Sequence, residues 1–163
     1  MKYIKTYETK ITQKALIETM TTFLKKALPD NFIVKLYQGT INIKDVSLGK
    51  SCDDKLLDKR RRNVGYFYVT GDTRSGFEMH LSCRTLEGSN INIAVKYIIG
   101  NLKDNMSVGK LFKFRYQEDF GWMYDQQYIV NFDSDYFKDV INMFNNLPPE
   151  DLNIFMIANK YNL

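Results

Sequence analysis

Residues 77–84, FEMHLSCR, alternate strictly between apolar and polar side chains. Phe77, Met79, Leu81 and Cys83 therefore share one face of an extended segment, and the polar residues between them share the other. This period of two is typical of a strand with one buried and one wet face, as in antiparallel sheets. The alternation constrains the fold more than any other feature, because it requires a sheet that is covered on one side.

A helical pattern precedes the sheet segments. Residues 11–28 place apolar side chains at helical spacing. Thr12 is a candidate N-cap, Lys25 and Lys26 suit the negative end of the helix dipole, and Pro29 ends the segment. We therefore expect one amphipathic helix near the N-terminus.

Two further helices are expected at the other end of the chain. The first follows the candidate caps Asp133 and Ser134, and the second begins at Pro148 and Pro149. Between the ends, residues 51–62 fit a short surface helix with acidic residues first and basic residues last. This order of charges needs no ligand to explain it.

The remaining segments read as strands separated by turns. Residues 31–38 and 40–46 predict a hairpin around Gly39 and Thr40. Further strands are expected at 64–71, 77–85, 90–99, 109–116 and 126–132, the first three of these as an antiparallel meander, with a loop at 117–125. Strands and helices are thus segregated along the chain, which indicates the α+β class.

The sequence predicts a single α+β domain over residues 1–163, with an antiparallel sheet of about five to seven strands. The N-terminal helix and the two C-terminal helices are expected to pack mainly on one face of the sheet. The other face would stay partly wet. We expect it to carry Glu78, His80, Arg84, Asn92 and Lys96, joined by Lys113 and Arg115 if the strand at 109–116 belongs to the same sheet.

Charge is distributed unevenly. Residues 1–116 hold 21 Lys and Arg against 11 Asp and Glu, whereas residues 117–163 hold 2 against 8. A basic face attracts phosphates or acidic proteins, although folding the two ends together would cancel part of the charge. The two cysteines, the lack of a signal-like apolar stretch and the lack of a membrane span of about 18 apolar residues indicate a cytoplasmic protein that does not enter the membrane.

Catalytic and cofactor motifs are not evident, and no catalytic residue, metal ligand or cofactor is predicted. His80 is the single histidine, and Cys83 falls on the opposite face of the same strand. A pairing of His80 with Cys52 across the fold stays open. Two Cys and one His are too few for a structural zinc site, and neither a Walker loop nor a dinucleotide-binding glycine motif occurs.

The stretch DKRRRNVGYFYVTG, residues 58–71, places cations directly before an aromatic strand. Arg62, Gly65 and Tyr66 resemble the basic, glycine and aromatic positions of the strand on which RNA-recognition sheets stack bases. Asn63 and Val64 interrupt that pattern and the order of elements differs, so membership of that family is not inferred. We interpret these cations first as the C-terminal end of a short helix and second as residues that contact phosphates.

The loop at 117–125 gathers bulky apolar side chains, which loops normally avoid. Trp122 either tucks under the sheet or anchors a partner. Together with the basic and aromatic positions it completes our set of candidate contact residues, which comprises Lys59, Arg60, Arg61, Arg62, Tyr66, Arg84, Lys96, Lys113, Arg115 and Trp122.

Three functions are compatible with these features. The first is a non-enzymatic binding protein, an inhibitor or accessory factor, that uses a basic face on a protein or nucleoprotein partner. The second is a single-stranded RNA- or DNA-binding protein that uses basic and aromatic residues. The third is a small hydrolase-type enzyme that uses His80. Small α+β proteins rich in Lys, Asn, Ile and Tyr are common among accessory proteins of phages and mobile elements, which favours the first.

Overall fold

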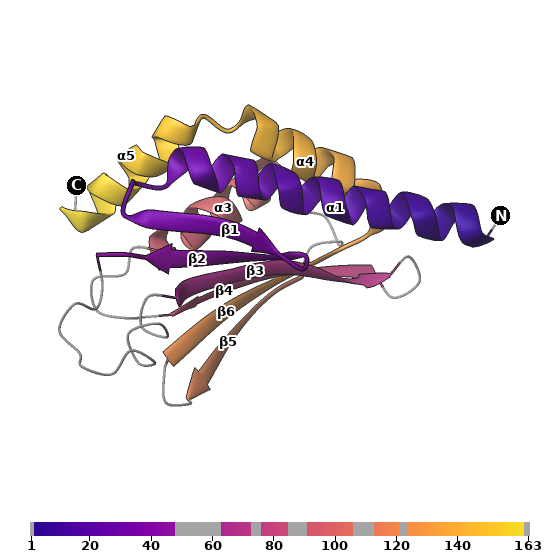
Figure 1. The fold of residues 1–163 in the computed structure, drawn as a ribbon, viewed down its shortest axis with the longest axis horizontal. Helices are drawn as coiled ribbons and strands as arrows, with labels where there is room; N and C mark the ends of the chain where they lie inside the picture. Colours follow the sequence, from indigo (N-terminus) through magenta and orange to yellow (C-terminus); the bar gives the residue numbers. More distant parts are fainter. Residues whose placement is uncertain are drawn as a thin grey trace.

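The described strands form one antiparallel sheet with the order β1-β2-β3-β4-β6-β5 (Figure 1). This computed structural model describes residues 2–47, 63–72, 76–84, 91–105, 113–120 and 124–161. The strands are β1 (Phe32–Tyr37), β2 (Thr40–Asp45), β3 (Asn63–Asp72), β4 (Gly76–Arg84), β5 (Lys113–Phe120) and β6 (Tyr124–Phe132). Because β6 pairs with β4, the sheet has β1 and β5 at its edges.

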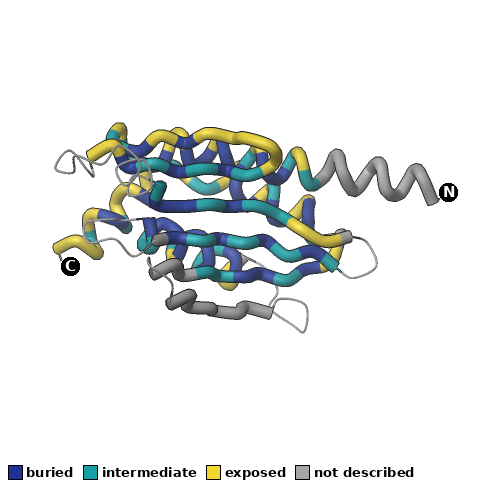
Figure 2. The backbone as a smooth tube through the Cα atoms, turned by 60° about the horizontal axis from the view of Figure 1, so that its bottom comes forward, coloured by how far each residue is buried: buried dark blue, intermediate teal, exposed yellow. Residues whose placement is uncertain are grey.

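All described helices lie on one side of this sheet (Figure 1). They are α1 (Lys2–Ala27), α3 (Ile91–Asn105), the short 3-10 helix η1 (Ser134–Tyr136), α4 (Phe137–Asn146) and α5 (Pro149–Lys160). Figure 2 looks onto the opposite side, where the strands of the sheet carry no helix. The predicted α+β class and the helices on one face are confirmed, with α3 as an additional member of the helical layer.

Alternation along the strands explains this one-sided arrangement. Phe67, Met79, Leu81 and Val130 are fully buried and face the helices, where they join the apolar stripes of α1, α3 and α4 in one core cluster. The predicted row on residues 77–84 is therefore confirmed, because Phe77 and Cys83 are each only 1% exposed.

Aromatic side chains connect the two layers. The Phe137 ring of α4 meets Phe77 of β4 and Phe132 of β6 edge-on, with centroid distances of 4.6 and 5.1 Å. Phe144 of α4 lies 5.7 Å from Phe23 of α1. Such pairs add about 0.5–1.5 kcal/mol each beyond the burial of their area, so α4 is held to both the sheet and the N-terminal helix.

The predicted hairpin at the start of the sheet is confirmed. Its strands pair from Phe32 with Asp45 to Tyr37 with Thr40. The two turn residues are Gln38 and Gly39, both with positive φ (48° and 74°), which is the two-residue turn whose twist matches that of paired strands. The turn thus lies one residue earlier than the predicted Gly39 and Thr40.

The strand predicted at residues 90–99 is wrong over its described part, since residues 91–99 belong to the helix α3. Its apolar residues satisfy both periods, and the helical stripe is completed by Ala94, Ile98 and Leu102, which are all buried. The predicted meander of three strands is therefore also wrong. Asn92 and Lys96 belong to the helical layer and not to the wet face of the sheet, and Lys96 is exposed there.

Several boundaries also differ from the predictions. The first helix begins at Lys2, so Thr12 lies within it and is not its N-cap. The N-cap of α4 is Tyr136 with no side-chain hydrogen bond, which corrects the predicted caps Asp133 and Ser134. The strand predicted at 109–116 is confirmed over residues 113–116, which lie in β5, and residues 109–112 are outside the described residues. The loop predicted at 117–125 is wrong at both of its described ends, because β5 continues to Phe120 and β6 begins at Tyr124. The short helix predicted at 51–62 lies outside the described residues.

Candidate functional site

The helix-free side of the sheet, here called the open face, carries the residues that alternate with the core. Because cross-strand partners share a face, the register of β1, β2, β3, β4 and β6 assigns its members. The described side chains of the open face are Ile33, Lys35, Tyr37, Thr40, Asn42, Lys44, Asn63, Tyr66, Tyr68, Thr70, Glu78, His80, Ser82, Gln127, Ile129 and Asn131. Apart from Ile33 and Ile129, each of these side chains is polar, charged or a tyrosine.

His80 lies at the centre of a hydrogen-bonded network on the open face. Its ring stacks on Tyr68, with a centroid distance of 4.5 Å and an interplanar angle of 6°. The Gln127 amide nitrogen lies 3.0 Å from His80 Nδ1 and 3.4 Å from the Tyr68 hydroxyl. On the other side of the ring, Nε2 lies 3.1 Å from Glu78 Oε2 and 3.4 Å from Thr70 Oγ1.

These contacts select one tautomer of the imidazole. An amide nitrogen only donates hydrogen bonds, so Gln127 donates to His80 Nδ1, which must be the acceptor. A carboxylate only accepts, so Nε2 carries the proton and donates it to Glu78. Of the two tautomers of the imidazole, the network therefore selects the one with the proton on Nε2, as assigned from hydrogen-bond partners.

Within the described residues, these contacts point the free lone pair of His80 at Gln127 and not at the Thr70 hydroxyl. Thr70 instead approaches Nε2, the nitrogen that carries the proton. A nucleophile–base pair needs the opposite arrangement. Cys83 is buried on the core side of β4, away from His80, and Cys52 lies outside the described residues. What the arrangement does provide is a fixed ring pair with its polar neighbours held in place.

A second feature of the open face is a continuous row of polar side chains across the sheet. Lys35 pairs in register with Asn42, Asn42 with Tyr66, Tyr66 with Ser82, and Ser82 with Gln127. With neighbouring strands about 4.8 Å apart, the row spans roughly 19 Å. It offers amide, hydroxyl and ammonium groups along one line, next to the stacked rings.

Charge on the open face is mainly positive at the end formed by β1 and β2. Lys35 is exposed and Lys44 is half-buried. Among the described side chains of this face the one carboxylate is that of Glu78, which is engaged by His80 at 3.1 Å. The described part of the face thus carries two lysines against one carboxylate that already has a partner.

The candidate contact residues predicted from the sequence are only partly brought together. Tyr66 lies on the open face, in register between Asn42 and Ser82. The backbones of Arg84, Lys113 and Arg115 pair with Asp125, Asn131 and Ile129 of β6. Lys96 lies apart, on α3. Lys59, Arg60, Arg61, Arg62 and Trp122 lie outside the described residues.

Sequence reasoning did not include the residues that surround His80 among the candidates. Tyr68 and Thr70 lie two and four residues after Tyr66 on β3, so the same alternation predicts that all three side chains share one face of the sheet. Gln127 had no such signal. It meets His80 only because β6 pairs with β4, and that pairing joins segments 47 residues apart.

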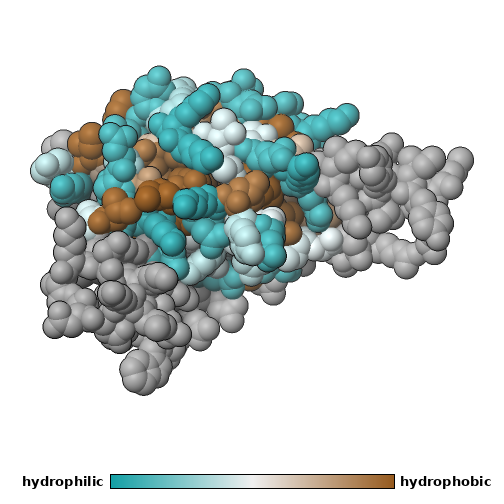
Figure 3. All heavy atoms as spheres, viewed as in Figure 1, coloured by the Kyte–Doolittle hydropathy of each residue, from teal (hydrophilic) through white to brown (hydrophobic). Residues whose placement is uncertain are grey.

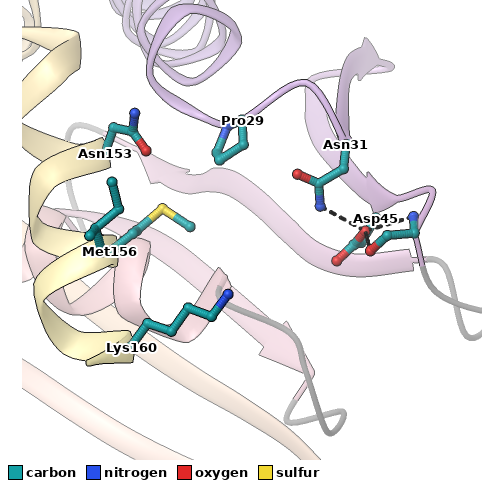
Figure 4. A pocket seen from close by; sticks show the side chains of 8 residues that line it. Pro29, Asn31, Asp45, Asn153, Met156 and Lys160 are labelled. Carbon is teal, nitrogen blue, oxygen red and sulfur yellow. Dashed lines mark hydrogen bonds between the residues drawn. The ribbon is translucent and has the colours of Figure 1, made fainter. Parts of the chain in front are cut away.

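A cavity of about 400 Å³ at the end of α5 is a second candidate (Figure 4). Its buried carboxylate, Asp45, is 1% exposed. Asn31 Nδ2 and the Ser47 backbone N–H donate to Asp45 Oδ1 at 3.0 and 2.9 Å, and the Ser47 hydroxyl donates to the same atom. Asp45 thus closes the turn after β2. Lys160, from α5, lines the same cavity (Figure 4). These contacts give the carboxylate a structural role.

Metal and membrane sites are not seen in the parts of the chain that the structure covers. Within the described ranges, no three His, Cys, Asp or Glu side chains gather closely enough to hold a metal ion. Among the described helices, none combines the length and hydropathy that a bilayer crossing requires. Comparison of the chain with protein-family models, with curated proteins and with solved structures finds no match.

Proposed function

We propose that this chain is a non-enzymatic binding protein, an inhibitor or accessory factor, whose contact surface is the open face and whose partner is a protein or a nucleoprotein complex. The observation that carries the proposal is the network of Tyr68, His80 and Gln127 at the centre of a sheet face that no described helix covers. A cytoplasmic site of action belongs to the same proposal, because two cysteines are too few for the disulfide framework of a secreted protein.

Pre-organisation supports binding by this surface. Ordering a rotamer-rich side chain at an interface costs about 0.5–1.5 kcal/mol. The side chains around His80 are already held by one another, so a partner would not have to order them. Tyr is also among the residues that most often dominate interface energetics. Tyr66 lies in the polar row between amides and a lysine, and Tyr68 lies two residues after it on the same strand.

The hydrolase hypothesis is not part of the proposal. It requires His80 to accept a proton from a nucleophile, while the described contacts direct its free lone pair toward Gln127. The chemistry of the open face is instead that of recognition, with hydrogen-bond donors and acceptors and aromatic rings displayed on a rigid support.

Affinity purification from the native cell tests the proposal. Tagged wild-type protein would be compared with an open-face double variant, Lys35→Glu with Tyr66→Ala, and with a control, Ile154→Ala, at a 63% exposed position of α5. Each would be purified with and without nuclease, after thermal unfolding has shown that all three are folded. We expect the double variant to lose its specific partner by at least about tenfold, roughly 1.4 kcal/mol, and the control to keep it.

Equal recovery of the partner by the double variant and the wild type would overturn the proposal. A further variant, with Arg60, Arg61 and Arg62 each changed to Glu, asks whether the basic segment contributes. Loss of the partner in this variant alone would move the contact surface from the open face to that segment.

A further inference from the structure

We infer that the open face binds single-stranded nucleic acid by stacking bases on the Tyr68–His80 ring pair and by neutralising phosphates with Lys35 and Lys44. This inference rests on the proposed function and narrows its partner to one chemical class. It is carried by three properties that coincide on one surface: stacked rings, a polar row and a local excess of cations.

The rings provide the first argument. Tyr68 and His80 stand on adjacent strands and lie parallel. Because the His80 side chain is only 12% exposed, a base would extend this stack from the Tyr68 side. Base–aromatic stacking is tolerant of sequence because every base has a flat π-face. Only a single strand can present its bases in this way, because a duplex keeps them paired and stacked internally.

The polar row provides the second argument. Asn42, Ser82 and Gln127 lie in register with Tyr66 between them. Amide and hydroxyl groups both donate and accept hydrogen bonds, so they can meet the exposed edges of any unpaired base. The row runs across the strands and passes beside the ring pair, because Tyr66 lies two residues before Tyr68 on β3 and Ser82 lies two residues after His80 on β4.

Charge complementarity provides the third argument and separates nucleic acid from an acidic protein surface. Lys35 and Lys44 lie on adjacent strands at one side of the rings, and the single described carboxylate of the face, Glu78, is bound to His80. A single strand laid across this face would contact these cations on β1 and β2 and the rings on β3 and β4. An acidic protein surface would also gain from the cations, but its carboxylates do not stack on rings, whereas every base of a single strand does.

Fluorescence anisotropy of labelled oligonucleotides tests the inference. The probes are oligo-dT and oligo-rU of about 12 nucleotides, inside the range of ~4–16 covered by single-strand sites on small β-domains, and a DNA duplex of equal length. We expect both single strands to bind at low salt and the duplex to bind at least about tenfold more weakly. The dT and rU arms show whether the 2′-hydroxyl contributes.

Matched variants assign binding to the open face. Tyr68→Ala should weaken binding by about 5- to 150-fold, the contribution of stacking one base, whereas Tyr68→Phe keeps the ring and should bind almost as the wild type does. The double variant Lys35→Glu with Lys44→Glu should lower the slope of log K against log salt by about 0.7 per lost phosphate contact. Lys160→Glu, which changes charge on the exposed end of α5, should leave the affinity within about twofold of the wild type, allowing only for long-range charge effects.

Absence of binding by every single strand at low salt would overturn the inference, as would equal weakening by Lys160→Glu and the lysine double variant, or duplex binding as tight as that of the single strands. If the oligonucleotides fail while a nuclease-resistant partner is still lost from the open-face variant in the purification experiment, the proposed function stands and only this inference falls.

Discussion

The rings of Tyr68 and His80 lie parallel, 4.5 Å apart between centroids, on adjacent strands of a sheet face that no described helix covers. Gln127 joins them from a third strand, since its amide nitrogen is within hydrogen-bonding distance of both. The three residues come from β3, β4 and β6, so the sheet itself fixes their relative positions. Any ligand of this face would meet them as one rigid unit.

The first prediction concerns the proton on His80. The chain has a single histidine, so its imidazole nitrogens can be observed by NMR after ¹⁵N labelling without ambiguity. We expect the neutral ring to carry its proton on Nε2. Gln127→Glu places a carboxylate at Nδ1, which should draw a proton to that nitrogen. Gln127→Leu is the control, because it removes the donor without adding an acceptor. A wild-type ring protonated on Nδ1 would contradict the assigned network.

The second prediction uses one substitution at two glycines. Gly100→Ala, in helix α3 with open space around the added methyl group, should stabilise by about 0.5–1 kcal/mol and raise Tm by about 1–4 °C. Gly65→Ala on β3 would meet Ile91 Cγ1 at 3.2 Å and Ile43 Cδ1 at 3.4 Å, so overpacking should cost about 1–3 kcal/mol. Thermal unfolding of the two variants shows whether each substitution raises or lowers the stability. Destabilisation by Gly100→Ala would argue that residues 91–105 are not helical.

Residues 91–105 also show where sequence reasoning about the fold fails. The strand at 77–84 was predictable because polar residues interrupt its apolar row at every second position, which only a strand satisfies. In α3 the run INIAVKYII is apolar at positions that fit both periods, so alternation from Ile91 to Ile99 looked like a strand. The residues that decide, Ala94 and Ile98, pack on the core only in the helix.

The candidate site shows a different limit. The alternation of side chains between the two faces of β3 and of β4 depends only on neighbouring residues. The location of Tyr66, Tyr68 and His80 on one face therefore follows from the sequence. The contact between His80 and Gln127 follows from strand order, because β6 lies next to β4 and β5 takes the edge. A single chain gives no local signal for that order, and hence none for the third member of the network.

The third prediction concerns the edge strand β1. Its outer backbone groups are not paired with another described strand, and Ile33, Leu36 and Tyr37 are 40, 40 and 67% exposed. Hydrophobic surface, brown in Figure 3, runs along this side of the molecule where β1 lies. Lys35 is the one charge in FIVKLY, and a charged residue on an edge strand opposes pairing with other chains.

Lys35→Val should therefore promote self-association that grows with protein concentration, measured by sedimentation velocity and light scattering. Lys35→Glu keeps a charge at the same position and should stay as dispersed as the wild type. Val46, also exposed at 37% but beyond the end of β2, offers a second comparison, because Val46→Lys should change dispersal little. Unchanged sedimentation of Lys35→Val at high concentration would show that another feature protects this edge.

The fourth prediction concerns Tyr97, which packs its ring 5.4 Å from Phe155 and so joins α3 to α5. Burial of the side chain raises the pKa of Tyr97 above its ordinary value, the nearby carboxylate of Asp151 adds to this, and a hydrogen bond from the Asn101 side chain works in the opposite direction. Ionisation of Tyr97 is therefore less favourable in the folded chain than in the unfolded chain.

The sign of the pH effect follows from this difference. Below about pH 10, the ordinary tyrosine pKa, both states hold the proton and the stabilising contribution is complete. Above it the unfolded chain releases the proton before the folded chain does, so the free energy of unfolding falls as pH rises through the folded-state pKa. Urea unfolding between about pH 9 and about pH 11 should show a steeper fall for the wild type than for Tyr97→Phe, which has no hydroxyl to ionise. Asp151→Asn removes the repelling charge and should reduce the fall only in part, because burial is the larger cause. Identical pH profiles for the wild type and Tyr97→Phe would mean that this tyrosine ionises as freely in the folded protein as in the unfolded chain.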